Sequence, residues 1–211
     1  MSASFAHFDW IAPVYDALVF VVFGRRLNRA QAVFLDRIPP GASVLIVGGG
    51  TGWLLEPLLT DGRAARIVYL ESSARMLARA SCRMLNRQLM GTVEFRLGDE
   101  RSLRSDERFD LLMTPFVLDL FTTETLQTLF IPRLRSALKE NGLWLITDFI
   151  RTSVWWQRAL LWSMIRFFIL TARIEARHLA DWQRLLSEAG LTLRERSPQV
   201  GGFVSTEVWS V

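Results

Sequence analysis

The 211-residue sequence contains one cysteine, two histidines and one lysine, Lys139, beside 24 arginines. With Cys82 alone, an intrachain disulfide and a thiolate-based zinc site are excluded, so we expect no metal centre and a cytoplasmic location. The first 16 residues have no basic region and include two aspartates, which argues against a secretory signal. The longest uncharged run, residues 38–55, has 18 residues and contains two prolines and five glycines, so no membrane-spanning helix is expected.

The formal net charge of +4 rests almost wholly on arginine. Proteins that bind nucleic acid usually cluster their basic residues, whereas the arginines here are spread along the chain. We therefore expect no nucleic-acid partner.

Short β-branched runs alternate with helix-patterned segments between residues 43 and 142, which is typical of βαβ units in a parallel sheet. Near-continuous hydrophobicity in these runs indicates strands that are covered on both faces. The expected strands are 44–47, 67–70, 93–97, 109–114 and 143–149, and the expected helices are 53–61, 73–88 and 123–139.

The length fits one domain, residues 1–211, in which four parts can be distinguished. Residues 1–40 form an apolar, helical N-terminal cap, and residues 41–150 form the core. Residues 151–190 form an apolar helical segment that ends in a helix over 179–189. Residues 191–211 form a terminal hairpin of strands 191–196 and 203–211, joined through Gly201-Gly202.

A glycine loop follows the first strand: Gly48, Gly49, Gly50, Thr51 and Gly52. Glycine permits positive φ angles and close approach of a ligand to backbone N–H groups at a helix start. The dinucleotide pattern G-x-G-x-x-G would need glycine where Trp53 stands, and no G-K-[ST] follows, so the match is to G-x-G-x-G.

Acidic residues end the next two strands. Glu71 follows Val68-Tyr69-Leu70, where a carboxylate is the natural partner of two ribose hydroxyls. Asp99 ends the third strand and could accept from an adenine amino group, and Glu100 beside it could take the same role. These side chains and the glycine loop converge on one crevice.

In order and spacing, these motifs resemble the class I S-adenosylmethionine-dependent methyltransferases, particularly small members similar to the ubiquinone and menaquinone methyltransferases. The resemblance also rests on residues 8–16, Met76-Leu77, residues 109–111 and Asn141-Gly142. It implies an α/β, Rossmann-like seven-stranded sheet with helices on both faces and an antiparallel C-terminal hairpin strand. It also implies S-adenosylmethionine as cofactor, with Tyr15 closing over its methionine end. The cofactor-binding candidates are Tyr15, Gly48, Gly49, Gly50, Gly52, Glu71, Ser72, Met76, Asp99, Glu100 and Thr114.

One position departs from the family pattern. An acidic residue usually stands two positions before the first glycine, where this chain has Ile46. Asp119, Asp148 or backbone carbonyls could hold the cofactor's ammonium group instead.

The most unusual segment is the apolar stretch 154–170. At 100° per residue, Arg151, Arg158, Arg166 and Arg173 form one cationic stripe. Three interpretations stay open: a lid over a bulky apolar acceptor, a structural face against the sheet or a homodimer partner, or peripheral contact with a membrane. The chain is accordingly expected to be a monomer or a homodimer.

The predicted activity is transfer of the sulfonium methyl to an oxygen, carbon or nitrogen of a small, hydrophobic acceptor. Alignment of the reactants can itself supply much of the rate, so a base is not essential. If a proton must be removed, the candidates are Asp119, Asp148, His7 and His178. The alternatives are an aminopropyltransferase that uses decarboxylated S-adenosylmethionine, which VLIVGGG also resembles, and a non-catalytic binding protein of the same fold.

Overall fold

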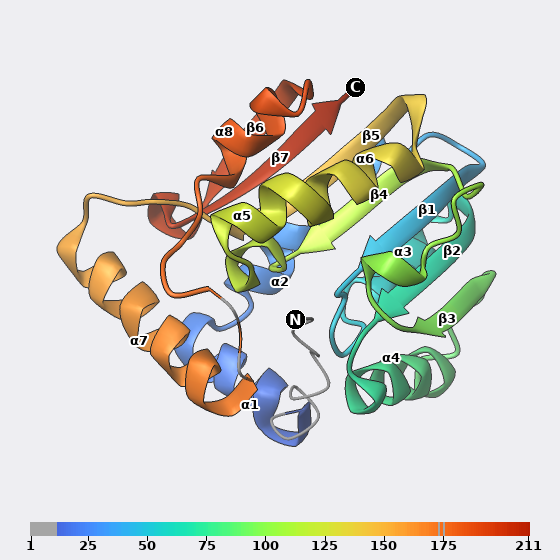
Figure 1. The fold of residues 1–211 in the computed structure, drawn as a ribbon. Coiled ribbons are helices and arrows are strands. Elements are labelled where there is room, and N and C mark those ends of the chain that lie inside the picture. Colours follow the sequence, from blue (N-terminus) through green and yellow to red (C-terminus); the bar gives the residue numbers. More distant parts are fainter. Residues whose placement is uncertain (1–11, 173, 175) are drawn as a thin grey trace.

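The computed structural model describes residues 12–172, 174 and 176–211, with the backbone alone for residues 12–15 and 18 (Figure 1). Its centre is a seven-stranded sheet of order β3-β2-β1-β4-β5-β7-β6. β7 runs antiparallel to both of its neighbours, and the other strands run parallel to one another. The strands are β1 Ala42–Val47, β2 Ala64–Glu71, β3 Val93–Leu97, β4 Phe109–Pro115, β5 Leu138–Phe149, β6 Thr192–Gln199 and β7 Val204–Ser210. The predicted seven-stranded fold is confirmed.

Helices cover both faces of this sheet (Figure 1). They are α1 Ala12–Phe23, α2 Arg26–Gln31, α3 Leu55–Asp61, α4 Ala74–Asn86, α5 Thr123–Thr125, α6 Ile131–Ala137, α7 Trp155–Ala172 and α8 Trp182–Glu188. Short 3₁₀ turns occupy Leu35–Arg37, Glu100–Ser102, Leu118–Leu120 and Val200–Gly202.

The central strand β1 shows how the two cores are built. Alternate residues of a strand point to opposite faces, and in β1 both sets are apolar. Leu45 and Val47 pack in the cluster that contains α6 and α8, whereas Val44 and Ile46 pack with α3 and residues 34–38. β1 is therefore buried on both sides, whereas the edge strand β3 has no buried residue, which corrects the expectation that every strand is covered on both faces. The carboxyl ends of β1 to β4 lie at one edge because these strands run parallel.

The predicted helix 123–139 is interrupted. A π-helical turn, Leu126–Phe130, separates α5 from α6, and the chain enters β5 at Leu138. Pro132 stands at the start of α6; its ring lacks an N–H and clashes with the carbonyl four residues earlier, which disfavours a regular α register there.

Two other helix starts follow from capping residues. Ser73 accepts a hydrogen bond from Met76 N at 3.1 Å, as expected for the N-cap of α4. α8 begins at Trp182, later than predicted, because the Asp181 side chain caps it by accepting from Arg184 N. Across the described ranges, no helix combines the length and hydropathy needed to cross a membrane.

α1 and α7 lie side by side at the end of the molecule that bears the carboxyl ends of the parallel strands (Figure 1). Phe23 and Val19 of α1 belong to one apolar cluster with Leu160, Leu161 and Met164 of α7. α1 and α7 therefore share one apolar cluster with Phe149 and Phe203 at the end of the sheet.

Candidate functional site

The glycine loop connects β1 to α3. Gly48, Gly50 and Gly52 have φ angles of +67°, +63° and +80°, a region that other residues rarely adopt. A Cβ at Gly52 would lie 2.7 Å from the Cα of Ala80 in α4, so this glycine allows loop and helix to pack closely. A Cβ at Gly50 would meet no protein atom within 4 Å, and Gly50 lines the cavity described below.

Glu71 lies at the carboxyl end of β2 and faces the loop. Its Oε2 accepts from Gly50 N at 3.0 Å and its Oε1 from Ser73 N at 2.9 Å. Burial raises the pKa of the Glu71 carboxyl above its ordinary value, and these backbone donors partly oppose the rise. The carboxylate is therefore held in one orientation with further lone pairs available to hydroxyl groups.

Tyr69 supports the loop from beneath. Its hydroxyl donates to Gly50 O at 3.0 Å, and its ring occupies the space that a Cβ at Gly49 would fill. Burial holds the pKa of the Tyr69 hydroxyl well above its usual range, so it stays a donor. The sequence contained no signal for this role, which depends on the parallel register that sets Tyr69 opposite Ile46.

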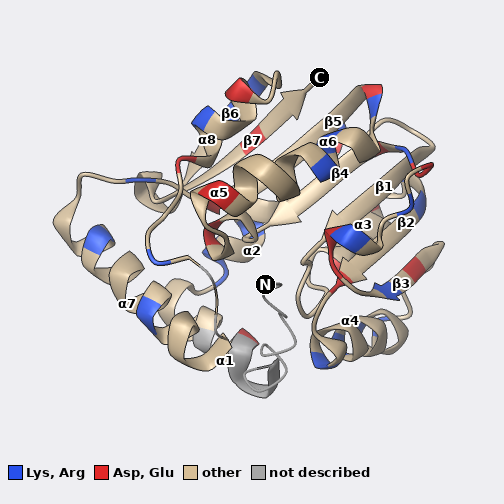
Figure 2. Ribbon diagram, in the orientation of Figure 1, with Lys and Arg blue, Asp and Glu red and all other residues tan. Residues whose placement is uncertain are grey.

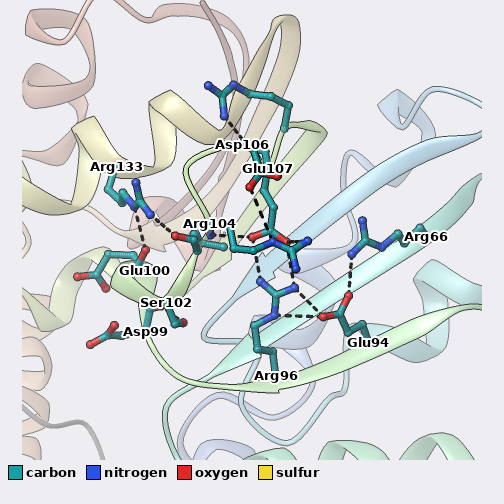
Figure 3. A network of polar contacts seen from close by, with 12 residues as sticks. Arg66, Glu94, Arg96, Asp99, Glu100, Ser102, Arg104, Asp106, Glu107 and Arg133 are labelled. Atoms are coloured by element: carbon teal, nitrogen blue, oxygen red, sulfur yellow. Dashed lines mark hydrogen bonds and ion pairs between the residues drawn. The ribbon is translucent and has the colours of Figure 1, made fainter.

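Asp99 and Glu100 follow β3 at the same edge. The Asp99 carboxylate accepts from Arg101 N at 3.0 Å, and Arg133 of α6 donates to the Glu100 carbonyl at 3.3 Å and to the Leu103 carbonyl. Figure 3 shows Glu100, Asp99 and Arg133 beside a second group of ion pairs that includes Arg96 and Glu107. The Arg96 guanidinium lowers the pKa of the Glu107 carboxyl to about 2. This network fixes the turn that carries Asp99.

These side chains border one cavity of about 450 Å³. Among the predicted cofactor residues, those that line it are Gly48, Gly49, Gly50, Glu71, Ser72, Met76, Asp99 and Glu100. Gly52 and Thr114 do not line it: Gly52 packs on α4, and the buried Thr114 hydroxyl accepts from Trp144 Nε1 at 3.0 Å.

The N-terminal cap contributes the opposite wall. Asp16 in α1 accepts from the Thr51 hydroxyl at 2.6 Å and from Arg83 Nη2 at 3.0 Å, while Arg83 Nε donates to Thr51 O. α1 is thereby tied to the glycine loop and to α4. Tyr15 belongs to α1, but its side chain and the whole of His7 lie outside the described residues.

Further cavity residues were not singled out from the sequence. They come from α1, α2 and the segment after β4, and include Phe20, Leu27, Asn28, Gln31, Phe116 and Phe121. Their placement depends on the docking of α1 and α2, which no local motif specifies.

Asp148 and Asp119 form a buried carboxylate pair beside the cavity and do not line it. Asp148 Oδ2 accepts from Val117 N at 3.1 Å and Leu118 N at 2.8 Å, so it positions the turn after β4. Burial raises the pKa of Asp119 to about 7, and burial together with the neighbouring Asp119 raises that of Asp148. Among the described residues, Asp119 Oδ1 is the buried side-chain oxygen left without a hydrogen-bond partner.

The described residues that line the cavity lie between 16 and 130, so none of the described residues of segment 151–190 is among them. The lid interpretation of this segment stays a prediction. His178 lies in a separate groove along α7. Over the described ranges, no group of three or more histidine, cysteine, aspartate or glutamate side chains is arranged to hold a metal ion.

Comparison with known proteins agrees with this geometry. Residues 44–142 match the family model described as a methyltransferase domain. No curated protein matches the chain.

Several solved structures share the fold. The mitomycin 7-O-methyltransferase MmcR is 19% identical, with a TM-score of 0.71 over 98% of this chain and 60% of that chain. The O-methyltransferase family 2 protein from Planctomyces limnophilus, in complex with apigenin, is 17% identical, with a TM-score of 0.68 over 92% and 61%. The DhpI-SAM-HEP complex is 20% identical, with a TM-score of 0.68 over 100% of both chains. The present chain thus spans about three fifths of the first two proteins and the whole of the third.

Proposed function

We propose that this chain methylates a hydroxyl group of a small, largely apolar acceptor. The premise is that residues 44–142 match the model of a methyltransferase domain and that solved methyltransferases share the fold. S-adenosylmethionine is the methyl donor of this class. Oxygen as the methylated atom is our inference, supported by the O-methyltransferases among the structures that share the fold.

The proposal rests mainly on one observation: the glycine loop and the Glu71 carboxylate lie side by side in the wall of one cavity. Gly50 presents open space and Glu71 presents a fixed carboxylate, 3.0 Å from Gly50 N. A nucleoside fits this pair, because the carboxylate can accept from two vicinal hydroxyls while the absent Cβ admits the ligand. Asp99 lines the same cavity after the next strand, and we assign it to the adenine amino group.

The acceptor end of the cavity is assigned to α1, α2 and the turn after β4. Its lining is mostly apolar, with Phe20, Leu27 and Phe116, and with two amides, Asn28 and Gln31, on α2. A small number of polar groups in an apolar wall is the usual arrangement for orienting a small molecule. We assign these amides to the acceptor's hydroxyl group.

The chemistry requires alignment more than a dedicated base. When bound, S-adenosylmethionine supplies an electrophilic methyl group on a sulfonium sulfur. The loop and Glu71 fix the position of the donor, and the α2 amides orient the acceptor oxygen toward it. Such positioning can lower a barrier by about 7 to 11 kcal/mol. The roles of Asp119, Asp148, His7 and His178 as bases stay predictions.

The aminopropyltransferase alternative is less well supported. The resemblance to those enzymes requires an aspartate at the position of Thr51. The Thr51 hydroxyl of this chain instead donates to Asp16.

The test is transfer of a labelled methyl group from S-adenosylmethionine to a panel of apolar phenols and alcohols. We expect labelled methyl ethers, and we expect Gln31→Ala to raise KM for the acceptor while leaving cofactor affinity unchanged. Glu71→Ala should weaken cofactor binding, whereas Glu94→Ala on the exposed part of β3 should not. Absence of transfer to every acceptor, together with product formation from decarboxylated S-adenosylmethionine and an amine, would overturn the proposal in favour of aminopropyl transfer.

A further inference from the structure

A second groove, of about 610 Å³, runs along α7 and shares no lining residue with the cofactor cavity. Four arginines line it: Arg151 before α7, Arg158 and Arg166 on α7, and Arg177 after it. Figure 2 shows basic positions and no acidic position on the α7 ribbon. The groove is therefore a concentrated positive surface on a chain whose other arginines are dispersed.

These arginines are not neutralised by carboxylates within the described part of the chain. None of them forms an ion pair with a described residue, and no described residue that lines the groove is acidic. Arg151 donates to the Leu179 carbonyl at 3.4 Å, and the Arg166 guanidinium lies 5.4 Å from the centre of the Trp162 ring. The groove thus has positive charge available for an anionic partner.

The same face of α7 exposes large apolar side chains. Trp155, Trp162 and Leu170 are 78%, 62% and 82% exposed. Trp155, Trp162 and Arg166 fall within about 40° of one another on a helical wheel. The outward face of α7 therefore combines tryptophan with arginine, while its inward face packs through Leu161 and neighbouring residues.

The neighbouring helix α1 also exposes apolar side chains. Phe20 and Val21 are 58% and 81% exposed, while Val19 and Phe23 of the same helix share an apolar cluster with α7. Phe20 also lines the cofactor cavity. Large exposed apolar surface of this kind marks an interaction site in a water-soluble domain.

We propose that the α7 groove and the adjoining end of α1 dock onto the surface of an anionic phospholipid bilayer. Tryptophan rings locate at the level of lipid headgroups, and arginines on such a helix pair with lipid phosphates. A symmetric homodimer through this face would place the same four arginines against their copies, which opposes that alternative. The exposed tryptophans and Leu170 favour lipid over a purely polyanionic partner such as nucleic acid. This docking surface does not depend on the methyl acceptor.

The experiment is co-sedimentation of the full chain with vesicles of phosphatidylcholine alone and of phosphatidylcholine with phosphatidylglycerol. We expect binding to the anionic vesicles, weaker binding to the neutral ones, and loss of binding as salt rises. Each arginine near an anionic surface contributes roughly fivefold to partitioning, so Arg158→Glu with Arg166→Glu should lower it by roughly 30-fold or more. Trp155→Gln with Trp162→Gln should also reduce binding, because it removes the interfacial side chains.

The matched control is Arg79→Glu with Arg87→Glu at α4, which has the same eight-residue spacing and lowers the net charge equally. The affinity of this control variant for anionic vesicles should stay within about twofold of that of the unsubstituted chain. Arg79 and Arg87 do not line the groove, and only arginines near the anionic surface contribute strongly to partitioning. Thermal unfolding and cofactor binding, measured on each variant, verify the fold. The proposal is overturned if the unsubstituted chain stays in the supernatant with anionic vesicles, or if both arginine pairs lower binding equally. Loss of a dimer, rather than of vesicle binding, in the tryptophan variant would assign this face to a second copy.

Discussion

Gly50 is the residue at which the glycine loop opens onto the cavity, and it offers the sharpest residue-scale test. We expect Gly50→Val to abolish measurable binding of S-adenosylhomocysteine by calorimetry, because the new side chain would occupy the space assigned to the cofactor. The substitution also forces a β-branched residue to φ +63°, which destabilises the fold by about 1–2 kcal/mol.

Gly62→Val is the control that separates backbone strain at a positive φ angle from steric obstruction of the cofactor. Gly62 has φ +71° and open space around its Cβ position, but it ends α3 outside the cavity. This variant should lose comparable stability and keep its affinity. Equal affinities in the two variants would show that the cofactor does not approach Gly50.

The raised pKa of the buried Asp119 carboxyl should give the folding stability an unusual pH dependence. Its pKa, raised by burial to about 7, lies above the unfolded value near 4, so the folded state binds the proton more tightly. The free energy of unfolding should therefore be highest at low pH with respect to this group and fall as pH rises from about 4 to about 7. Asp119→Asn should make that fall smaller without abolishing it, because burial also raises the pKa of Asp148, and urea denaturation at pH 5 and pH 8 would measure the difference.

The exposed aspartate Asp106 provides the control for this experiment. Asp106→Asn should leave the pH profile unchanged, since that carboxyl is 82% exposed. If Asp119→Asn and the unsubstituted chain lose stability in parallel between pH 5 and pH 8, the pKa assignment is wrong.

At the scale of elements, α1 is held against the cofactor cavity by Asp16. The carboxylate joins Thr51 of the glycine loop and Arg83 of α4, in a partly exposed cluster. Exposed ion pairs contribute about 1 kcal/mol or less, so Asp16→Asn should change the melting temperature little. We expect it to weaken cofactor affinity and to speed amide hydrogen exchange in residues 16–23, because α1 is released from the loop.

Glu188→Gln is the matched change at a site remote from the cavity, where it breaks the exposed pair with Arg184 in α8. It should alter neither cofactor affinity nor exchange in α1. Unchanged exchange in α1 of the Asp16→Asn chain would mean that other contacts hold the helix in place.

The sequence predicted those elements whose pattern is local. Strand 44–47 is apolar throughout because it is covered on both faces, and this is visible without tertiary information. Strand 93–97 contains Glu94 and Arg96 and is exposed or half-buried at every residue, so the expected cover on both faces is wrong for this edge strand. The helix over 123–139 was predicted as one piece because periodicity does not reveal how Pro132 alters the register. The cationic stripe of α7 was visible in the sequence through Arg158 and Arg166, but an apolar helix does not disclose which of its other sides packs in the cluster with α1.

The same distinction applies to the site. Glu71 and Asp99 were predicted because the carboxyl ends of parallel strands meet at one edge of a sheet, and both line the cavity. Tyr69, Arg83, Asn28 and Gln31 were missed, because their roles depend on register and on the packing of α1, α2 and α4. Their residue types form no motif that would single them out.

At the scale of the whole molecule, α1 joins the two functional surfaces. One side of it borders the cofactor cavity through Asp16 and Phe20, and another side packs on α7 with its arginine groove. An acceptor drawn from a bilayer would reach the cavity next to the docking surface.

The most direct test of the central claim is thermal unfolding of the full chain with S-adenosylmethionine, S-adenosylhomocysteine and NAD. A ligand at a hundredfold excess over its Kd stabilises the folded state by about 2.7 kcal/mol, which for a domain of this size raises Tm by roughly 5–11 °C. We predict that rise with both sulfur compounds and none with NAD. A rise with NAD alone, or no rise with either sulfur compound at millimolar concentration, would contradict the assignment of the cavity.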